Sequence, residues 1–342
     1  KITPYTTGQF MMIDTSTRRN LELVETLREK QKRGSLLWVL DKTKTAMGAR
    51  LLRSFIEQPL IDKEEIERRQ QAIEELNMNY ISREEIREYL NSVYDLERLM
   101  GRISYKTANP RDLLSFKNSL EMLPYIKDIL GEFSCELLKK MNEDLDPLRD
   151  LYELIDRSIV DEPPITVREG NIIKDGYSEE ADKYRKAEGK AWLADLETEE
   201  KEKTGIKNLK IKYNKVFGYY FEVTNSFKDL VPEYFIRKQT LTNAERYTTD
   251  RLKELEDIIM GAEDRLYTLE YDLFCDVRDQ IAAEVLRIQS TAKAIAGIDV
   301  FTSLSTVSMR NNYVKPKINE KGVINIKNGR HPVVEKMIKD SL

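Results

Sequence analysis

The stretch that decides the fold is Gly205–Tyr247, which reads GIKNLKIKYNKVFGYYFEVTNSFKDLVPEYFIRKQTLTNAERY. Within it, Leu209–Tyr213 alternates apolar and basic side chains, the period-two pattern of a half-buried strand. Asn214–Gly218 is typical of a chain reversal, because glycine adopts positive φ without strain. The aromatic and β-branched run Tyr219–Thr224 is expected to return as the partner strand. With a third strand at Tyr234–Leu241, the stretch predicts a small antiparallel sheet that carries lysines on one face.

The sequence on both sides of this sheet is predominantly helical in pattern. Ser178 is expected to cap a charged helix that runs to about Lys203. After the sheet, a helix is expected to start near Ala244 and to continue past Leu286. Its apolar residues recur at spacings of three and four, which predicts lengthwise packing on a partner helix. About forty residues at ~1.5 Å each make a rod of roughly 60 Å. Farther on, Val323–Ile326 is predicted to be a strand.

The charge pattern restricts any nucleic-acid contact to the sheet. The chain has 342 residues and a net charge of −4, so the molecule as a whole is no polycation. From Ile206 to Asp250 there are eight Lys or Arg against five Asp or Glu, a net charge of +3, which leaves −7 for the rest by subtraction. Lysine is a flexible point charge that suits phosphates and carries no base information. The alternatives are a merely solvated strand face, or edge lysines that deter aggregation.

The candidate binding residues lie on and around the predicted strands. Strand alternation places two lysines on one face, away from the apolar residues between them. Asparagine and threonine side chains at the turns add neutral hydrogen bonds to phosphate oxygens. The candidate contacts with a nucleic-acid backbone are Lys210, Lys212, Asn214, Lys215, Thr242, Asn243 and Arg246.

Catalytic chemistry finds little support in the sequence. His331 is the only histidine, so neither a histidine-based triad nor a multi-histidine metal site exists within one chain. No glycine-rich phosphate loop followed by Lys-Ser or Lys-Thr occurs. Glu222 is expected to be a neighbour of the lysines rather than a general base. Cys135 and Cys275 are expected to be free thiols in a reducing compartment. We therefore expect no catalytic, cofactor-binding or metal-binding residues, and no signal peptide or membrane span.

At these residues the chain resembles the MutS family of DNA mismatch-repair proteins. The stretches that carry the resemblance occur in the family's order and with suitable separations: Asp14–Leu23 (DTSTRRNLEL), Tyr213–Tyr220 (YNKVFGYY), Arg237–Tyr247 (RKQTLTNAERY) and Gly329–Val333 (GRHPV). The resemblance covers essentially the whole chain. Since the chain starts at a lysine and stops in mid-pattern, we expect it to be a fragment.

The resemblance implies a mainly α fold, in which a multi-helix core carries two long lever helices with a small antiparallel β clamp inserted between them. The expected segments are the helical core and first lever (1–185), the clamp (186–249), the second lever helix returning to the core (250–314) and the start of an ATPase domain (315–342). The family's mismatch-reading and nucleotide-binding parts lie outside these segments. This chain is therefore expected to be no enzyme and to hold no cofactor, whereas the parent protein would use ATP and Mg²⁺.

In the family, two clamps of a dimer close around duplex DNA and hold its backbone without reading sequence. Carried over by position, the implied backbone contacts are Asn214, Lys215, Thr242, Asn243 and Arg246. Many relatives carry a lysine at the position of Thr242, so one phosphate contact is expected to be weaker here. The implied partners are duplex DNA, a second copy of the parent protein and the downstream repair protein MutL. The implied location is the cytoplasm of a bacterial cell, associated with the nucleoid. The alternative function is a coiled-coil scaffold whose sheet docks a protein.

Overall fold

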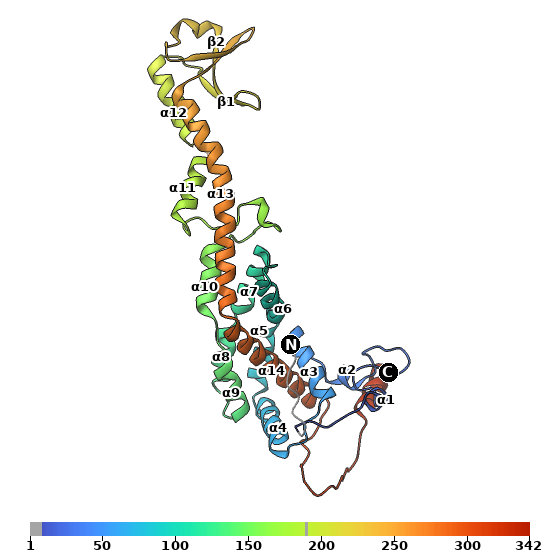
Figure 1. Ribbon diagram of the computed structural model, residues 1–342. Coiled ribbons are helices and arrows are strands. Elements are labelled where there is room, and N and C mark those ends of the chain that lie inside the picture. The colour runs from blue at the N-terminus through green and yellow to red at the C-terminus, as the bar shows by residue number, and fades with distance from the viewer. Residues whose placement is uncertain (1–8, 189–190) are drawn as a thin grey trace. The chain divides into compact units, whose positions relative to one another are not determined.

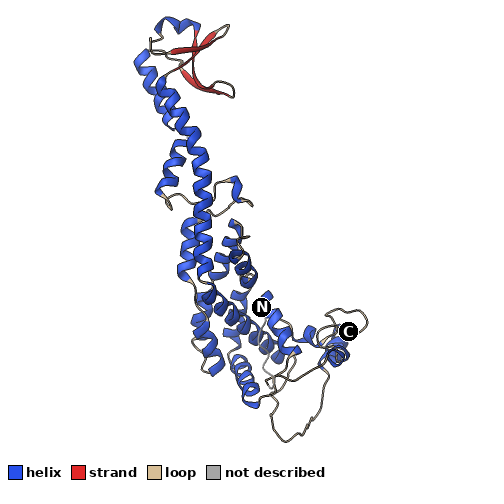
Figure 2. Ribbon diagram, viewed as in Figure 1, coloured by secondary structure: helices blue, strands red, loops and turns tan. Residues whose placement is uncertain are grey.

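The computed structural model of the chain describes residues 9–188 and 191–342 (Figure 1). The α-helices are α1 Thr15–Asn20, α2 Leu36–Leu40, α3 Ala46–Glu57, α4 Lys63–Met78, α5 Tyr80–Leu90, α6 Leu96–Ser104, α7 Pro110–Leu120, α8 Leu123–Leu130, α9 Glu136–Asp144, α10 Arg149–Ser158, α11 Glu179–Glu188, α12 Ala191–Thr204, α13 Asp250–Ala283, α14 Val285–Arg310 and α15 Pro332–Asp340. The strands are β1 Lys210–Asn214, β2 Gly218–Thr224, β3 Ile236–Thr240 and β4 Ala244–Thr248, and short 3-10 helices cover Val167–Glu169 and Asn225–Leu230. Helices make up 60% of the structure, which confirms the mainly α fold with a small antiparallel sheet (Figure 2).

The chain divides into two compact units. Unit 1 contains the described residues of 1–108, 112–156 and 278–342, and unit 2 contains residues 109–111 and 157–277. The centre of unit 1 is α14, whose side chains are buried along most of its length. A helix without a polar face has to be covered on all sides, and α3, α4, α5, α6 and α9 pack against it.

Unit 2 is built around the antiparallel sheet, whose strand order is β1-β2-β4-β3. Phe221 and Tyr247 are directly paired across β2 and β4, and both face the apolar core of the unit. Leucines of α12 and α13 complete that core, among them Leu196 and Leu255. The ring of Phe235 stacks on Phe221 with a centroid distance of 5.0 Å. The sheet is therefore anchored through one face on two helices, and its other face carries the polar residues.

Three predicted secondary-structure features were wrong: the start of the long helix after the sheet, the end of that helix, and the strand near the C-terminus. A helix was expected from Ala244, but Ala244–Thr248 forms the fourth strand, and α13 begins at Asp250. Alanine, glutamate and arginine favour helices, yet tertiary pairing of Tyr247 with Phe221 overrides that local preference. The helix-start signal is Thr249, whose hydroxyl accepts a hydrogen bond from the Leu252 N–H at 3.1 Å.

The same helix was expected to pass Leu286, but α13 ends at Ala283 and α14 starts at Val285, so the first rod has 34 residues. The backbone at Glu284 turns out of the helical region without a proline or glycine to mark it in the sequence. The strand predicted at Val323–Ile326 is absent as well, and Ile324 and Ile326 are exposed. A strand needs a neighbouring strand that supplies its hydrogen bonds, and no strand in the described part of the chain pairs with these residues.

The helix predicted after Ser178 is confirmed at its start. The Ser178 hydroxyl accepts a hydrogen bond from the Ala181 N–H at 3.2 Å, as an N-cap does. Farther along, α11 ends at Glu188 and α12 continues from Ala191 to Thr204. Residues 189 and 190 lie outside the described residues.

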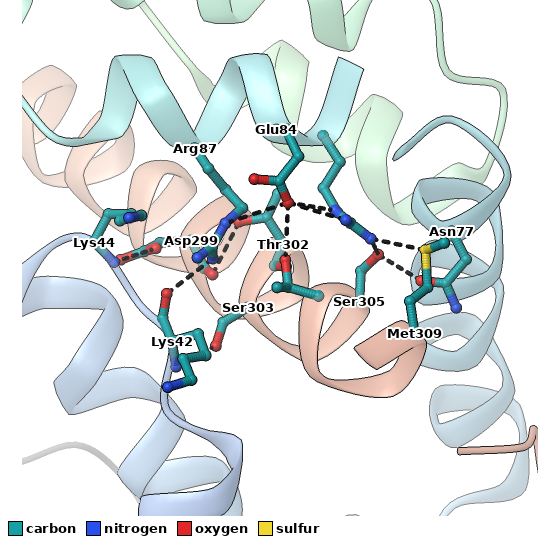
Figure 3. Close-up of polar contacts among 12 residues, drawn as sticks. Lys42, Lys44, Asn77, Glu84, Arg87, Asp299, Thr302, Ser303, Ser305 and Met309 are labelled. Atoms are coloured by element: carbon teal, nitrogen blue, oxygen red, sulfur yellow. Dashed lines mark hydrogen bonds and ion pairs between the residues drawn. The ribbon is translucent and has the colours of Figure 1, made fainter. Parts of the chain in front are cut away.

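A buried polar network fixes the segment between α2 and α3 onto α14 (Figure 3). Asp299 of α14 is completely buried and accepts hydrogen bonds from the N–H groups of Lys44 and Thr45, both at 2.8 Å, and from the Thr45 hydroxyl at 2.7 Å. Arg87 of α5 donates to the Lys42 carbonyl at 2.8 Å. Burial raises the pKa of Asp299 and lowers the pKa of Arg87. The network therefore keeps two costly buried charges in place through several satisfied donors and acceptors.

Gly48, in the first turn of α3, lies next to the Asp299 carboxylate of this network. A Cβ atom at position 48 would come within 2.0 Å of the Asp299 Oδ2. The Gly48 N–H donates to the Thr45 hydroxyl at 3.0 Å, which in turn donates to Asp299. The first turn of α3 is thus capped by Thr45, and Thr45 is held by Asp299. The absence of a side chain at Gly48 allows the carboxylate to approach the helix.

Candidate nucleic-acid interface

The reversal between β1 and β2 is held by hydrogen bonds to its own backbone. The Asn214 side-chain oxygen accepts from the N–H groups of Val216, at 2.8 Å, and Phe217, at 3.3 Å. Lys238 donates from its Nζ to the Phe217 carbonyl at 2.8 Å. Gly218 has a φ of +75°, which confirms the predicted left-handed conformation. These contacts leave Lys215 exposed at the tip of a fixed turn.

Gly218 is required for a second reason, which the sequence did not reveal. Glu256 of α13 accepts a hydrogen bond from the Tyr219 N–H at 3.2 Å, and its Oε1 would lie 1.7 Å from a Cβ at position 218. The hairpin is therefore attached to α13 by a carboxylate that occupies the space of the missing side chain.

Replacing Gly218 by alanine is expected to destabilise unit 2 by roughly 1–3 kcal/mol, because the positive φ is strained and Glu256 has to move. The matched control is Gly205→Ala, since Gly205 has a similar φ of +73° but open space around it. Thermal unfolding followed by near-ultraviolet circular dichroism measures both variants. Equal losses of stability in the two would show that Glu256 contributes nothing.

The polar face of the sheet is defined here by Lys210, Lys212, Tyr220, Glu222 and Arg246. Strand register places Lys210 opposite Glu222, and Glu222 opposite Arg246 on the other side. Lys212 forms an ion pair with Glu222, which raises the pKa of Lys212. The predicted neighbourhood of Glu222 and the lysines is therefore confirmed. Lys210 and Lys212 are both exposed.

Arg246 is fixed in the polar face by two contacts. Its guanidinium lies over the Tyr220 ring, 4.5 Å from the centroid, and donates to the Gln239 side-chain oxygen at 2.8 Å. A stacked guanidinium loses little further freedom on contact with a phosphate. Tyr220 and Gln239 were not among the candidate residues, because neither carries charge and only strand register places them beside Arg246.

Thr242 and Asn243 lie at the opposite end of β2 from Lys215. They form the turn between β3 and β4, and both side chains are exposed. Asn225, just after β2, bonds to the backbone carbonyls of both residues, each at 3.1 Å. From Gly218 to Thr224, β2 makes six steps of ~3.3 Å, so the candidate residues extend over roughly 20 Å. The structure thus places them in a hairpin tip, a central polar face and a far turn, rather than in one cluster.

Two tyrosines of unit 2 donate to carboxylates. Tyr234 donates to Glu200 at 2.6 Å, and Tyr247 donates to Glu245. Burial, together with these carboxylates, raises the pKa of each tyrosine to about 12. The folded state therefore favours the neutral phenols.

This arrangement predicts an alkaline transition in unit 2. The folded pKa values exceed the ordinary value of 10.0, so the stabilisation is fully present below pH 10 and is lost as the pH rises through about 12. Phenolate absorbance is expected to show tyrosines that ionise late, together with a falling melting temperature. Tyr234→Phe should remove part of the late fraction, and the exposed Tyr105→Phe should remove none of it. An identical late fraction in both variants would contradict the assignment.

Within residues 9–188 and 191–342, no group of His, Cys, Asp or Glu side chains is arranged to hold a metal ion. Cys135 and Cys275 are free and half-buried, and burial raises the pKa of Cys135 to about 11. None of the described helices has the length and apolar character that a membrane crossing needs.

The structure places the chain in a class of mainly helical proteins with a small inserted sheet. The polar face of that sheet carries lysines. Comparison with known families is more specific: residues 16–305 match the family model described as MutS domain III, so the chain belongs to that family. The domain matched is the core and lever region of a mismatch-repair protein.

Similar proteins are named DNA mismatch repair protein MutS. The one from Lachnoclostridium phytofermentans is 67% identical over 343 residues, covering 100% of this chain and 37% of the relative. Those from Ruminiclostridium cellulolyticum and Caldanaerobacter subterraneus subsp. tengcongensis are 55% and 56% identical, each over 98% of this chain and 39% of the relative. The chain thus spans less than half the length of these relatives.

Proposed function

We propose that this chain holds the backbone of duplex DNA through the polar face and turns of its sheet, without reading sequence. We propose also that residues 186–249 act as the clamp, that 1–185 and 250–314 act as core and levers, and that 315–342 lead into an ATPase domain. In the parent protein, the helices would couple the grip on DNA to that domain. The binding itself needs no catalytic group and no cofactor in this chain; ATP and Mg²⁺ would bind elsewhere in the parent protein.

The observation that carries the proposal is the fixed placement of cationic and amide side chains over roughly 20 Å of one small sheet. Lys210 and Lys212 are exposed on a strand, Lys215 is exposed on a hydrogen-bonded turn, and Arg246 is stacked in place. Sites so far apart suit a polyanion with regularly spaced charges, rather than one small anion. Lysine contacts with phosphate fix position and carry no sequence information.

The chain is expected to bind weakly by itself. With ~2–4 phosphate contacts, the logarithm of the association constant should fall with the logarithm of salt concentration at a slope of roughly −2 to −4. The expected dissociation constant is ~10⁻⁴ to 10⁻⁶ M or weaker at physiological salt. A second copy of the parent protein would supply avidity. Dimerisation, contact with MutL and a place on the bacterial nucleoid belong to the parent protein and are carried over here from the family resemblance.

Fluorescence anisotropy of a labelled duplex across a salt series tests the proposal. Duplexes of equal length, with and without a mismatch, are expected to give the same slope and the same affinity. The rival function, a scaffold whose sheet docks a protein, predicts no salt-steep DNA binding. Affinity that depends on the mismatch, or binding that does not change with salt, would contradict the proposal.

A further inference from the structure

The tip of the β1–β2 hairpin exposes apolar side chains in the middle of its lysines. Val216 is 81% exposed and Phe217 is 40% exposed. Single exposed apolar residues are ordinary, but these two are adjacent and lie in the turn between β1 and β2. Lys215 immediately precedes them, and Lys238 contacts the Phe217 carbonyl.

The hairpin tip is also held in one conformation. Asn214 accepts hydrogen bonds from the N–H groups of Val216 and Phe217, and Gly218 supplies the positive φ that closes the turn. Glu256, a carboxylate beside Gly218, accepts a hydrogen bond from the Tyr219 N–H. The two apolar side chains are therefore presented on a rigid support, with basic side chains next to them.

Resting on the proposed function, we infer that Val216 and Phe217 enter the minor groove of the duplex, while Lys215 contacts a phosphate at its edge. The walls of that groove are formed by the C–H surfaces of deoxyribose, and apolar side chains recur there as wedges. The groove is ~6 Å wide, and two paired strands with side chains exceed that width. The side chains of Val216 and Phe217 therefore enter the groove, whereas the backbone of the hairpin stays outside it. A polyanion with an apolar groove matches a basic hairpin with an apolar tip.

Apolar and ionic contacts respond differently to salt, which allows them to be separated. Counterion release depends on the number of phosphates contacted, whereas burial of apolar surface releases no counterions. Val216→Ser combined with Phe217→Ser is expected to weaken binding about 10-fold at every salt concentration, with an unchanged slope. Lys215→Gln is expected to make the slope shallower by about 1.

A milder variant distinguishes the loss of an apolar contact from disruption of the hairpin. Val216→Thr keeps the shape of an exposed side chain, and it is expected to weaken binding about 3-fold with the slope again unchanged. Circular dichroism of the aromatic residues should match that of the wild-type protein. A lack of effect on DNA affinity in both apolar variants would overturn the inference.

Duplexes that differ in a single chemical group of one groove show whether the tip contacts the minor or the major groove. Inosine·cytosine pairs lack the minor-groove amino group of guanine·cytosine pairs. Replacing guanine by inosine is expected to tighten binding of the wild-type protein a few-fold, and this gain should disappear in the Val216→Ser, Phe217→Ser variant. Sensitivity to replacement of thymine by uracil, which changes only the major groove, would overturn the assignment. Salt-steep binding by the wild-type protein, without any response to tip or groove, would leave the proposed function standing and this inference wrong.

Discussion

The Lys210→Glu, Lys212→Glu, Lys215→Glu variant is expected to bind a DNA duplex at least ~100-fold more weakly at low salt. The substitutions turn three positive charges into three negative ones on and beside one face, so phosphates that were attracted are repelled. Each lost lysine contact is expected to remove about one unit of the salt slope, so little or no salt dependence should remain. Anisotropy titration against the same duplex as for the wild-type protein gives both quantities.

Two controls separate site from total charge. Lys139→Glu, Lys183→Glu and Lys293→Glu change the net charge equally at exposed positions on helices outside the sheet, and should leave affinity within a few-fold. The exchange Lys212→Glu with Glu222→Lys preserves both the ion pair and the local charge, and should retain binding. If the substitutions on the helices weaken binding as much as those on the sheet, the assignment of the site is wrong.

Asp299→Ala is expected to destabilise unit 1 by roughly 3–5 kcal/mol. The carboxylate satisfies the buried N–H groups of Lys44 and Thr45 and the Thr45 hydroxyl, and its loss leaves these donors without their acceptor. It also removes one of the two negative charges, Glu84 and Asp299, that partly offset the desolvation of the buried Arg87. Urea unfolding monitored by far-ultraviolet circular dichroism should show a lower midpoint for unit 1.

A double-mutant cycle with Gly48 tests the cause of that loss. Gly48→Ala alone is expected to be destabilising, because its Cβ would lie 2.0 Å from Asp299 Oδ2. In the Asp299→Ala background the carboxylate is gone and only the Cβ of residue 299, 2.7 Å from the added Cβ, remains, so the second substitution should cost less. Strict additivity of the two free-energy changes would show that the carboxylate and Gly48 do not interact.

The sequence predicted the features that local pattern controls. Alternation in Leu209–Tyr213 predicted the first strand, and the need for positive φ predicted the conformation of Gly218. The wrong start of the helix at Ala244 shows where local preference fails. There, pairing of Tyr247 with Phe221 and packing on the core decide the backbone, and both come from residues far away in sequence.

The charged residues of the candidate site could be predicted from the sequence, whereas the contacts that hold them in place could not. A stretch rich in basic residues is visible in the sequence, so Lys210, Lys212 and Lys215 could be selected from it. The contacts of Glu256 with the hairpin and of Gln239 with Arg246 depend on tertiary placement, and no spacing in the sequence signals them. Val216 and Phe217 lie in the predicted reversal, but the sequence did not show that their side chains are exposed.

Amide hydrogen–deuterium exchange of this chain, with and without a saturating duplex at low salt, shows directly whether the turns of the sheet contact DNA. We expect slower exchange on DNA binding in the β1–β2 turn, residues 214–218, and in the β3–β4 turn, residues 241–243. Exchange in α4 and α9 of unit 1 should stay unchanged. Protection confined to the helices of unit 1, with the two turns unaffected by DNA, would show that the sheet is not the DNA-binding site.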